Sequence, residues 1–154
     1  MVKSLRIYLE TTVFNYYFDS DRDAHPHTVR LFKYIAAGMY EAYTSKYVIG
    51  ELKAAKEYKR SRMLNLIPEY DIRVLEESDD ASRLANLYIT EKVIPKDHRT
   101  DALHIAISAV NDIDMILSLN FKHIVSKRTE DLTGKINIQN GYRKVEIRSP
   151  TEVV

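Results

Sequence analysis

The chain has 154 residues, of which 45% are hydrophobic and 29% are charged, and its formal net charge is +1. These proportions are ordinary for a globular protein with a buried core, and they exclude a disordered or low-complexity chain. The sequence has no cysteine, which excludes disulfides and thiol chemistry and leaves carboxylates, amides and histidines as metal ligands. Residues 1–154 are therefore predicted to form a single domain.

Apolar runs in the sequence are short. The residues before Glu10 include only three consecutive apolar residues, too few for a signal peptide. No run reaches the length of a membrane span. We therefore expect a cytoplasmic protein with no membrane association.

Strand-like and helix-like segments alternate along the chain. In chain order, the predicted elements are a strand at Leu5–Leu9, a helix at Pro26–Ala37, a strand at Ala42–Thr44, helices at Val48–Arg62 and Arg62–Leu66, a strand at Ile72–Leu75, a helix at Ala81–Glu91, a helix with Thr100 as its N-cap, and strands at Met115–Ser118 and Val145–Arg148. This alternation predicts an α/β fold with a mainly parallel sheet.

Four polar residues stand where predicted strands end or predicted helices begin. Glu10 follows the first strand, and Asn120 follows the fourth. Glu51 lies near the first turn of its helix, and Asp101 opens the helix after Thr100. Acids near a helix N-terminus meet the positive end of the macrodipole, and polar residues after strands are common in turns. Each position alone therefore also has a purely structural explanation.

Taken together, the four positions indicate chemistry. In a parallel sheet, strand ends and the starts of the following helices gather at one edge, where open α/β proteins bind ligands. Three carboxylates there would repel one another and raise their own pKa values unless a cation joined them. Oxygen ligands without cysteine or a histidine pair suit Mg²⁺ or Mn²⁺. Such ions activate water and clamp a phosphodiester during in-line attack.

The segments around these residues resemble a known family. "IYLETTVF", "TSKYVIGEL", "DALHIAISAV" and "ILSLNFKHI" occur in the order and spacing of the PIN-domain nucleases. The chain resembles the compact prokaryotic kind, to which the VapC-type toxins of toxin–antitoxin pairs belong. The tail, "INIQNGYRKVEIRSPTE", extends the resemblance over essentially the whole chain.

The resemblance implies a fold, an activity and partners. The implied fold is a PIN-like three-layer α/β fold, with a mainly parallel central sheet flanked by helices on both faces. The implied activity is that of a metal-dependent endoribonuclease using Mg²⁺ or Mn²⁺. RNA is then the substrate, a small antitoxin protein is a partner, and a homodimer is expected.

Position by position, the resemblance also implies the site. It assigns the catalytic and metal-binding positions to Glu10, Glu51, Asp101 and Asn120. Thr12 and Ser118 match hydroxyl positions that help to hold acids or water. Two residues depart from the family pattern: Glu10 adds a methylene where an aspartate is usual, and Asn120 removes a charge where an aspartate is common. Both departures bear on the strength of metal binding.

Basic residues and histidines surround these positions. The basic residues that follow Glu51 on the same predicted helix include Lys53, Lys56, Lys59 and Arg60. A charge run on a helix is usually a solvated face, but in a ribonuclease such residues would contact RNA phosphates. His104 and His123 flank the expected site, although a single histidine is more often a packed or capping residue than a ligand.

Other functions stay open at the level of sequence. The strongest alternative is a PIN-fold module that has lost turnover and acts in binding or assembly, because Glu10 and Asn120 depart from the family pattern. A structure-specific DNA nuclease would resemble longer proteins with added helical segments. A phosphatase with an acyl-phosphate nucleophile is disfavoured because the first strand ends in Glu-Thr-Thr without paired aspartates.

Overall fold

A parallel sheet forms the centre of the molecule. The computed structural model describes residues 4–154, and the strand order of its five-stranded sheet is β3-β2-β1-β4-β5. The strands are β1 (Leu5–Leu9), β2 (Tyr40–Ser45), β3 (Arg73–Leu75), β4 (Met115–Leu117) and β5 (Glu146–Arg148). The strand β1 has its predicted bounds and lies in the middle, paired in parallel with β2 and β4.

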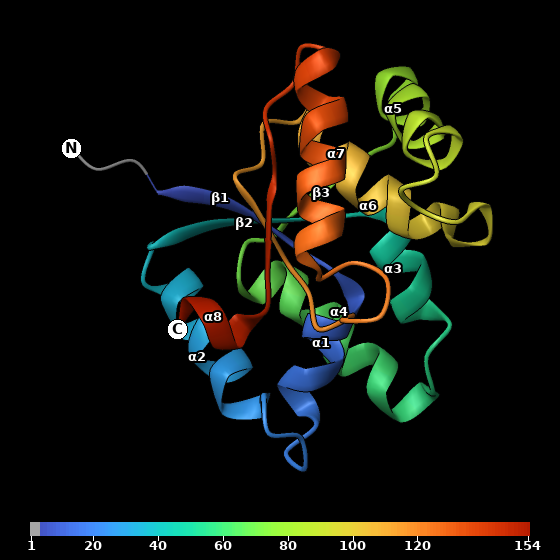
Figure 1. The fold of residues 1–154 in the computed structure, drawn as a ribbon. Coiled ribbons are helices and arrows are strands. Elements are labelled where there is room, and N and C mark those ends of the chain that lie inside the picture. Colours follow the sequence, from blue (N-terminus) through green and yellow to red (C-terminus); the bar gives the residue numbers. More distant parts are fainter. Residues whose placement is uncertain (1–3) are drawn as a thin grey trace.

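Helices cover both faces of this sheet. They are α1 (Thr11–Phe18), α2 (His25–Ala36), α3 (Lys46–Lys53), α4 (Glu57–Glu69), α5 (Asp79–Thr90), the 3₁₀ turn η1 (Lys96–His98), α6 (Arg99–Val110), α7 (Lys127–Gln139) and α8 (Pro150–Val153). Figure 1 shows α5, α6 and α7 on one side of the sheet and α1, α2 and α4 on the other. The three-layer α/β arrangement expected from the sequence is therefore confirmed. Within residues 4–154, no helix is both long enough and apolar enough to span a bilayer.

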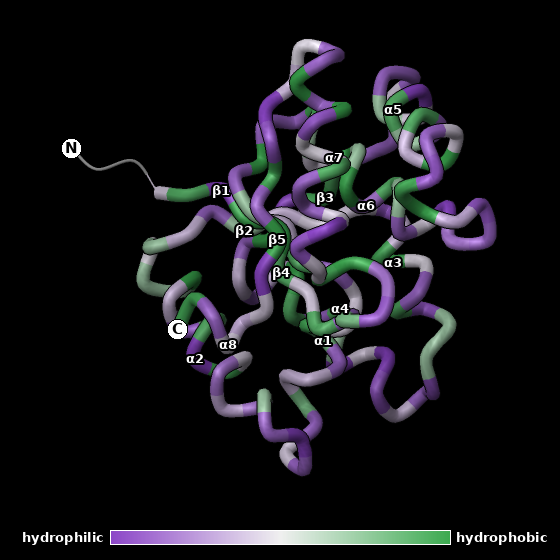
Figure 2. The backbone as a smooth tube through the Cα atoms, viewed as in Figure 1, coloured by the Kyte–Doolittle hydropathy of each residue, from purple (hydrophilic) through white to green (hydrophobic). Residues whose placement is uncertain are grey.

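The buried core explains why the centres of β1 and β4 are apolar. Ile7, Tyr8 and Leu9 of β1 are fully buried, as are Ile116 and Leu117 of β4. A strand covered by helices on both faces buries every side chain, so it appears as a continuous apolar run without alternation. Figure 2 shows this hydrophobic centre along the strands, with hydrophilic residues over much of the outer helices and loops.

The helices after β2 differ from the prediction. The single helix expected over Val48–Arg62 is two helices, because α3 ends at Lys53 and α4 begins at Glu57. The backbone turns at Ala54, whose N–H bonds back to α3 carbonyls. This turn lets α4 pack back against α3, and α4 then runs on to Glu69, well past the predicted end of the third helix at Leu66.

The helix that carries Asp101 begins earlier than predicted. The predicted N-cap, Thr100, lies inside α6, and the N-cap position belongs to His98. The 3₁₀ turn η1 runs directly into α6, so the helical backbone is already established before Thr100. Asp101 still lies in the first turn of α6, as the sequence indicates.

Candidate functional site

The carboxyl ends of β1, β2 and β4 meet at one edge of the sheet because all three strands are parallel. Glu10 directly follows β1, Ser45 ends β2 and caps α3, and Ser118 directly follows β4. The backbone N–H of Glu10 donates to the carbonyl of Leu117, 3.1 Å away, which fixes the ends of β1 and β4 side by side. This edge is where the sequence places the candidate site.

Glu10 is buried and firmly held, with an exposure of 4%. Its Oε1 accepts hydrogen bonds from the Thr12 backbone N–H (3.2 Å), the Thr12 hydroxyl (2.5 Å) and the Ser118 hydroxyl (2.7 Å). The Thr12 hydroxyl oxygen in turn accepts from the backbone N–H of Leu119, at 2.8 Å. Glu10 is thus the N-cap of α1 and a link to the end of β4, while no hydrogen bond within residues 4–154 uses its Oε2.

Glu51 lies in the second turn of α3, because the helix begins at Lys46, two residues before the predicted start at Val48. Its Oε1 accepts a hydrogen bond from the Thr11 hydroxyl (2.9 Å) and lies 3.4 Å from Nε2 of His104. Partial burial acts to raise the pKa of Glu51, but the contact with His104 and the Thr11 hydrogen bond outweigh it, and the pKa is lowered. Its side chain is 46% exposed, so Glu51 presents a carboxylate at the open side of the site.

A series of buried polar contacts runs from Glu51 into the core. Nδ1 of His104 lies 2.6 Å from the Tyr8 hydroxyl, which lies 2.7 Å from the Ser45 hydroxyl. Burial raises the pKa of Tyr8 far above its ordinary value, so this hydroxyl keeps its proton. The general expectation of a packed histidine holds for His104, whose side chain is 1% exposed. No sequence pattern indicates its contacts with Tyr8 and Glu51, which come from different elements.

Asp101 differs from both glutamates because none of the hydrogen bonds within residues 4–154 involves its carboxylate. Its side chain is 16% exposed, and its Oδ2 lies 3.7 Å from Nδ1 of His98. Burial raises the pKa of Asp101; the neighbouring His104, His123 and His98 oppose this shift, and the negative charge of Glu51 adds to it. Asp101 is therefore a partly desolvated carboxylate near a second acid, the electrostatic situation that a cation relieves.

Asn120 takes part in the turn after β4. Its Oδ1 accepts from the backbone N–H of His123 (3.1 Å), and its own backbone N–H donates to the Ser118 hydroxyl (3.0 Å). Ser118 therefore connects Asn120 to Glu10. The turn explanation is correct for the Asn120 amide oxygen, which keeps a second lone pair for another partner.

The acids share one edge of the sheet but do not close around a common point. Among residues 4–154, the set of three acidic or histidine side chains with ligand atoms within 4.8 Å of one another is His98, Asp101 and His123. Glu10 and Glu51 lie outside that set. The three acids thus form an open group at this edge of the sheet.

The donor chemistry of this open group nevertheless suits a hard divalent cation. Glu10 and Glu51 are each anchored through Oε1 alone, and Asp101 uses neither oxygen in a hydrogen bond within residues 4–154. Each carboxylate therefore keeps at least one oxygen that is not committed to the protein. Mg²⁺ and Mn²⁺ take oxygen ligands of this kind and retain several waters, so they do not require a closed protein cage.

The basic residues after Glu51 lie on two elements, not on one helix as predicted. Lys53 ends α3, Lys56 is the N-cap of α4, and Lys59 and Arg60 lie in the first turn of α4. None of the four forms an ion pair with another described residue. Lys53, Lys56 and Arg60 are exposed, so their charges face solvent close in sequence to Glu51.

Comparison by sequence finds no protein-family profile and no curated protein that match this chain. Comparison by structure finds clear similarity. VapC20 from Mycobacterium tuberculosis, a toxin that cleaves the sarcin–ricin loop, superposes with a TM-score of 0.58 at 15% identity, over 91% of this chain and 98% of that chain. VapBC2 from Rickettsia felis, bound to a DNA fragment from its promoter, gives a TM-score of 0.59 at 11% identity, over 94% and 98% of the two chains. The likeness to VapC-type PIN domains that the sequence motifs indicate is therefore confirmed for the fold.

Proposed function

We propose that this chain is a single-domain, metal-dependent endoribonuclease that hydrolyses RNA phosphodiesters and serves as the toxin of a toxin–antitoxin pair. One observation carries the proposal: Glu10, Glu51 and Asp101 stand at the carboxyl edge of the parallel sheet, each with an oxygen that is not committed to the protein. The structural similarity to VapC20, a toxin that cleaves the sarcin–ricin loop, supports RNA as the substrate class.

The proposed roles follow from how each acid is held. Glu10, Glu51 and Asp101 would hold Mg²⁺ or Mn²⁺, with Asn120 completing the ligand set, and the bound ion would supply an activated water and stabilise charge on the phosphate. Thr12 and Ser118 orient Glu10 through its Oε1. Thr11 and His104 orient Glu51 in the same way. These contacts fix the direction of two acids before substrate binds, which is the preorganisation that such a site needs.

The basic residues that follow Glu51 supply the contacts to the RNA backbone in this proposal. Lys53, Lys56, Lys59 and Arg60 carry no ion-pair partner among the described residues, so substrate phosphates need not displace an internal carboxylate. Contacts of this kind provide affinity without sequence preference and weaken as salt rises.

The proposed partners extend beyond RNA. A small antitoxin protein would cover the acidic edge, which is the edge of the sheet where Glu10, Glu51 and Asp101 lie, and would hold the enzyme inactive. The similarity to VapBC2 supports such a partner. A homodimer and a cytoplasmic location complete the proposal.

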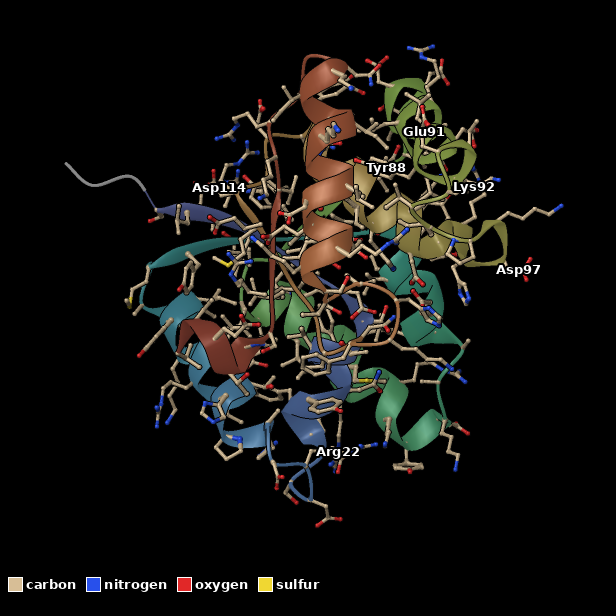
Figure 3. The ribbon with its side chains drawn as sticks, in the orientation of Figure 1. Arg22, Tyr88, Glu91, Lys92, Asp97 and Asp114 are labelled. Carbon is tan, nitrogen blue, oxygen red and sulfur yellow. The ribbon has the colours of Figure 1, made fainter. Side chains whose placement is uncertain are left out.

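Loss of one charge at either acid tests the activity directly. Glu10→Gln and Asp101→Asn should each reduce Mn²⁺-dependent cleavage of single-stranded RNA by at least about 100-fold, because each removes a charged ligand of the ion. Asp114→Asn is the matched control: Asp114 precedes β4 and so lies at the opposite edge of the sheet (Figure 3). Cleavage that persists in Glu10→Gln and Asp101→Asn at the control rate would refute the assignment of these acids.

The basic surface needs a separate measurement. Lys56→Gln/Arg60→Gln should weaken RNA binding at low salt and lower the slope of log affinity against log salt by about 0.7 for each phosphate that is no longer bound. The control Lys33→Gln/Lys135→Gln removes the same charge from α2 and α7. Equal reductions in the two double variants would indicate a general charge effect without a defined RNA path.

A catalytically inactive binding module is the second candidate, and the open spacing of the acids favours it. In that case the acids would bind no ion tightly, and Mn²⁺ would not raise the melting temperature. In the nuclease, Mn²⁺ should raise it for the wild type but not for Asp101→Asn, because ligand binding to the folded state adds to its stability. A wild type that neither cleaves RNA nor gains stability from Mn²⁺ or Mg²⁺ would establish the inactive module.

A further inference from the structure

Two histidines from distant parts of the chain meet beside Asp101. His98 ends η1, and His123 lies in the loop between β4 and α7. Their rings stack with centroids 3.8 Å apart and planes at 28°. Together with Asp101, each offers a ligand atom within 4.8 Å of the other two. The loop that carries His123 is fixed by the bond from its backbone N–H to Asn120.

The donor atoms of this cluster are not committed to the protein. Within residues 4–154, no hydrogen bond uses a ring nitrogen of His98 or His123. By contrast, His104 uses Nδ1 toward Tyr8, and His25 places Nδ1 2.8 Å from the carbonyl of Tyr16. The side chains of His98 and Asp101 are 35% and 16% exposed, so the cluster is partly shielded from water but open to a small ion.

We propose that His98, Asp101 and His123 form a transition-metal site that binds Zn²⁺ in preference to Mg²⁺. Two imidazoles and one carboxylate are the ligand set of many catalytic zinc centres, in which one further position stays open. Imidazole nitrogen is a good ligand for Zn²⁺ and for other late first-row transition metals, whereas Mg²⁺ prefers oxygen ligands. The site is distinct from the oxygen-only pair Glu10 and Glu51.

To close around the ion, the two stacked rings must turn so that one nitrogen of each points at a common position, because the in-plane lone pairs of stacked rings run nearly parallel. Ligand atoms of a tetrahedral zinc site, each about 2.1 Å from the metal, lie roughly 3.4 Å from one another. Nδ1 of His98 is already 3.7 Å from Oδ2 of Asp101. Rotations of these side chains, all near the protein surface, bring the third donor to the same range.

Sharing of Asp101 gives the site a consequence for the proposed nuclease, and this part rests on the proposed function. An acid that ligates Zn²⁺ together with His98 and His123 is drawn away from the ion at Glu10 and Glu51. Zn²⁺ therefore inhibits cleavage supported by Mg²⁺, and it does so through His98 and His123, which are not among the ligands assigned to Mg²⁺. The concentration of available Zn²⁺ then regulates RNA cleavage.

Calorimetric titration with Zn²⁺ alone tests the site without any activity. His98→Gln/His123→Gln should lower Zn²⁺ affinity by about 100-fold or more, because two of three protein ligands are removed. The matched control, His25→Gln/His27→Gln, removes two histidines elsewhere and should bind Zn²⁺ as the wild type does. Glu10→Gln should also keep its Zn²⁺ affinity.

Two calorimetric results would overturn the site. One is an unchanged Zn²⁺ affinity in His98→Gln/His123→Gln. The other is an equal reduction in Glu10→Gln, which would place the ion among the acids. Neither result depends on RNA cleavage. The zinc site can therefore be refuted while the proposed nuclease activity is supported, and the nuclease activity can be refuted while the zinc site is supported.

Inhibition provides the second measurement. With saturating Mg²⁺, Zn²⁺ should inhibit RNA cleavage by the wild type and by His25→Gln/His27→Gln, but not by His98→Gln/His123→Gln, each relative to its own activity without Zn²⁺. Equal inhibition of all three would refute the regulatory role even where the calorimetry supports the site.

Discussion

The two halves of the acidic edge are built differently. On the β1–β4 side, Glu10 is buried and accepts three hydrogen bonds from Thr12 and Ser118. On the α6 side, Asp101 accepts none from the described residues and is surrounded by imidazole rings. The fold fixes the Glu10 carboxylate by hydrogen bonds, whereas it partly desolvates the Asp101 carboxylate without giving it a hydrogen bond from the described residues.

This difference separates stability from function within one site. Removal of Glu10 leaves the buried Ser118 hydroxyl and the partly buried Thr12 donors without this acceptor, so the fold depends on it. Neutralisation of Asp101 removes a partly desolvated charge, so we expect it to stabilise the fold without metal. An acid that lowers the stability of the fold is a stronger indication of ligand binding than an acid whose hydrogen bonds stabilise the fold.

The largest expected effect is from Glu10→Ala. This substitution leaves the Thr12 N–H and the Thr12 and Ser118 hydroxyls without their acceptor and should destabilise the protein by about 2–4 kcal/mol. Glu10→Gln keeps an acceptor oxygen and should fold with a much smaller loss of stability while remaining inactive. Urea denaturation of both variants measures the difference. Equal stability of Glu10→Ala and Glu10→Gln would show that water replaces these bonds at no cost.

A smaller effect is expected from Ser118→Ala, which removes one donor to Glu10 and the acceptor of the Asn120 N–H. Stability should fall by about 1–2 kcal/mol, and cleavage by about 10–100-fold, the usual effect of removing a residue that orients a metal ligand.

Ser108→Ala is the control for this variant. The Ser108 hydroxyl is equally buried but donates to the His104 carbonyl within α6. Its removal should affect stability without a comparable decrease in activity. Similar decreases in activity in Ser108→Ala and Ser118→Ala would mean that general loosening of the fold explains both.

The smallest effect, and the one of opposite sign, is from Asp101→Asn. Burial raises the pKa of Asp101, so between its unfolded and folded pKa values the native protein binds more protons than the unfolded chain. The free energy of unfolding of the wild type therefore falls as pH rises through this interval. Asp101→Asn lacks this pH dependence and should melt at a higher temperature than the wild type above the interval.

Thermal melts in EDTA across a pH series measure this prediction. The advantage of Asp101→Asn should be absent at pH values below the unfolded pKa of Asp101, grow through the interval and stay constant above it. Addition of Mn²⁺ should reverse the order of the two proteins. An advantage that grows toward acidic pH would contradict the sign.

The sequence predicts the sheet well and the helices less well, for a physical reason. Strands buried on both faces, such as β1, appear as apolar runs that need no knowledge of their neighbours. The helix α7 was not predicted because Lys127–Gln139 is mainly polar. It is fixed instead by tertiary contacts, such as the buried Glu130 carboxylate that accepts the backbone N–H of Ile147. Contacts of this kind leave no periodic pattern along the chain.

The candidate site divides in the same way. Glu10, Glu51 and Asp101 could be selected because each acid stands next to a recognisable strand end or helix start. The support from Tyr8 to His104 could not, because it joins residues 96 positions apart. The sequence places His123 beside the site, but its stacking on His98 could not be predicted, since only the packing of the β4–α7 loop against the start of α6 brings the two rings together.

The bond from Ser118 to Glu10 spans 108 positions of the chain, and this separation bears on how the protein is made. Synthesis runs from the N-terminus, so Glu10 leaves the ribosome long before Ser118 exists. Contacts between such distant segments form late in folding, because the loop between them must first be ordered. A growing or truncated chain that ends before β4 therefore holds Glu10 only through the local bonds from Thr12, and it lacks the Ser118 bond that ties Glu10 to β4.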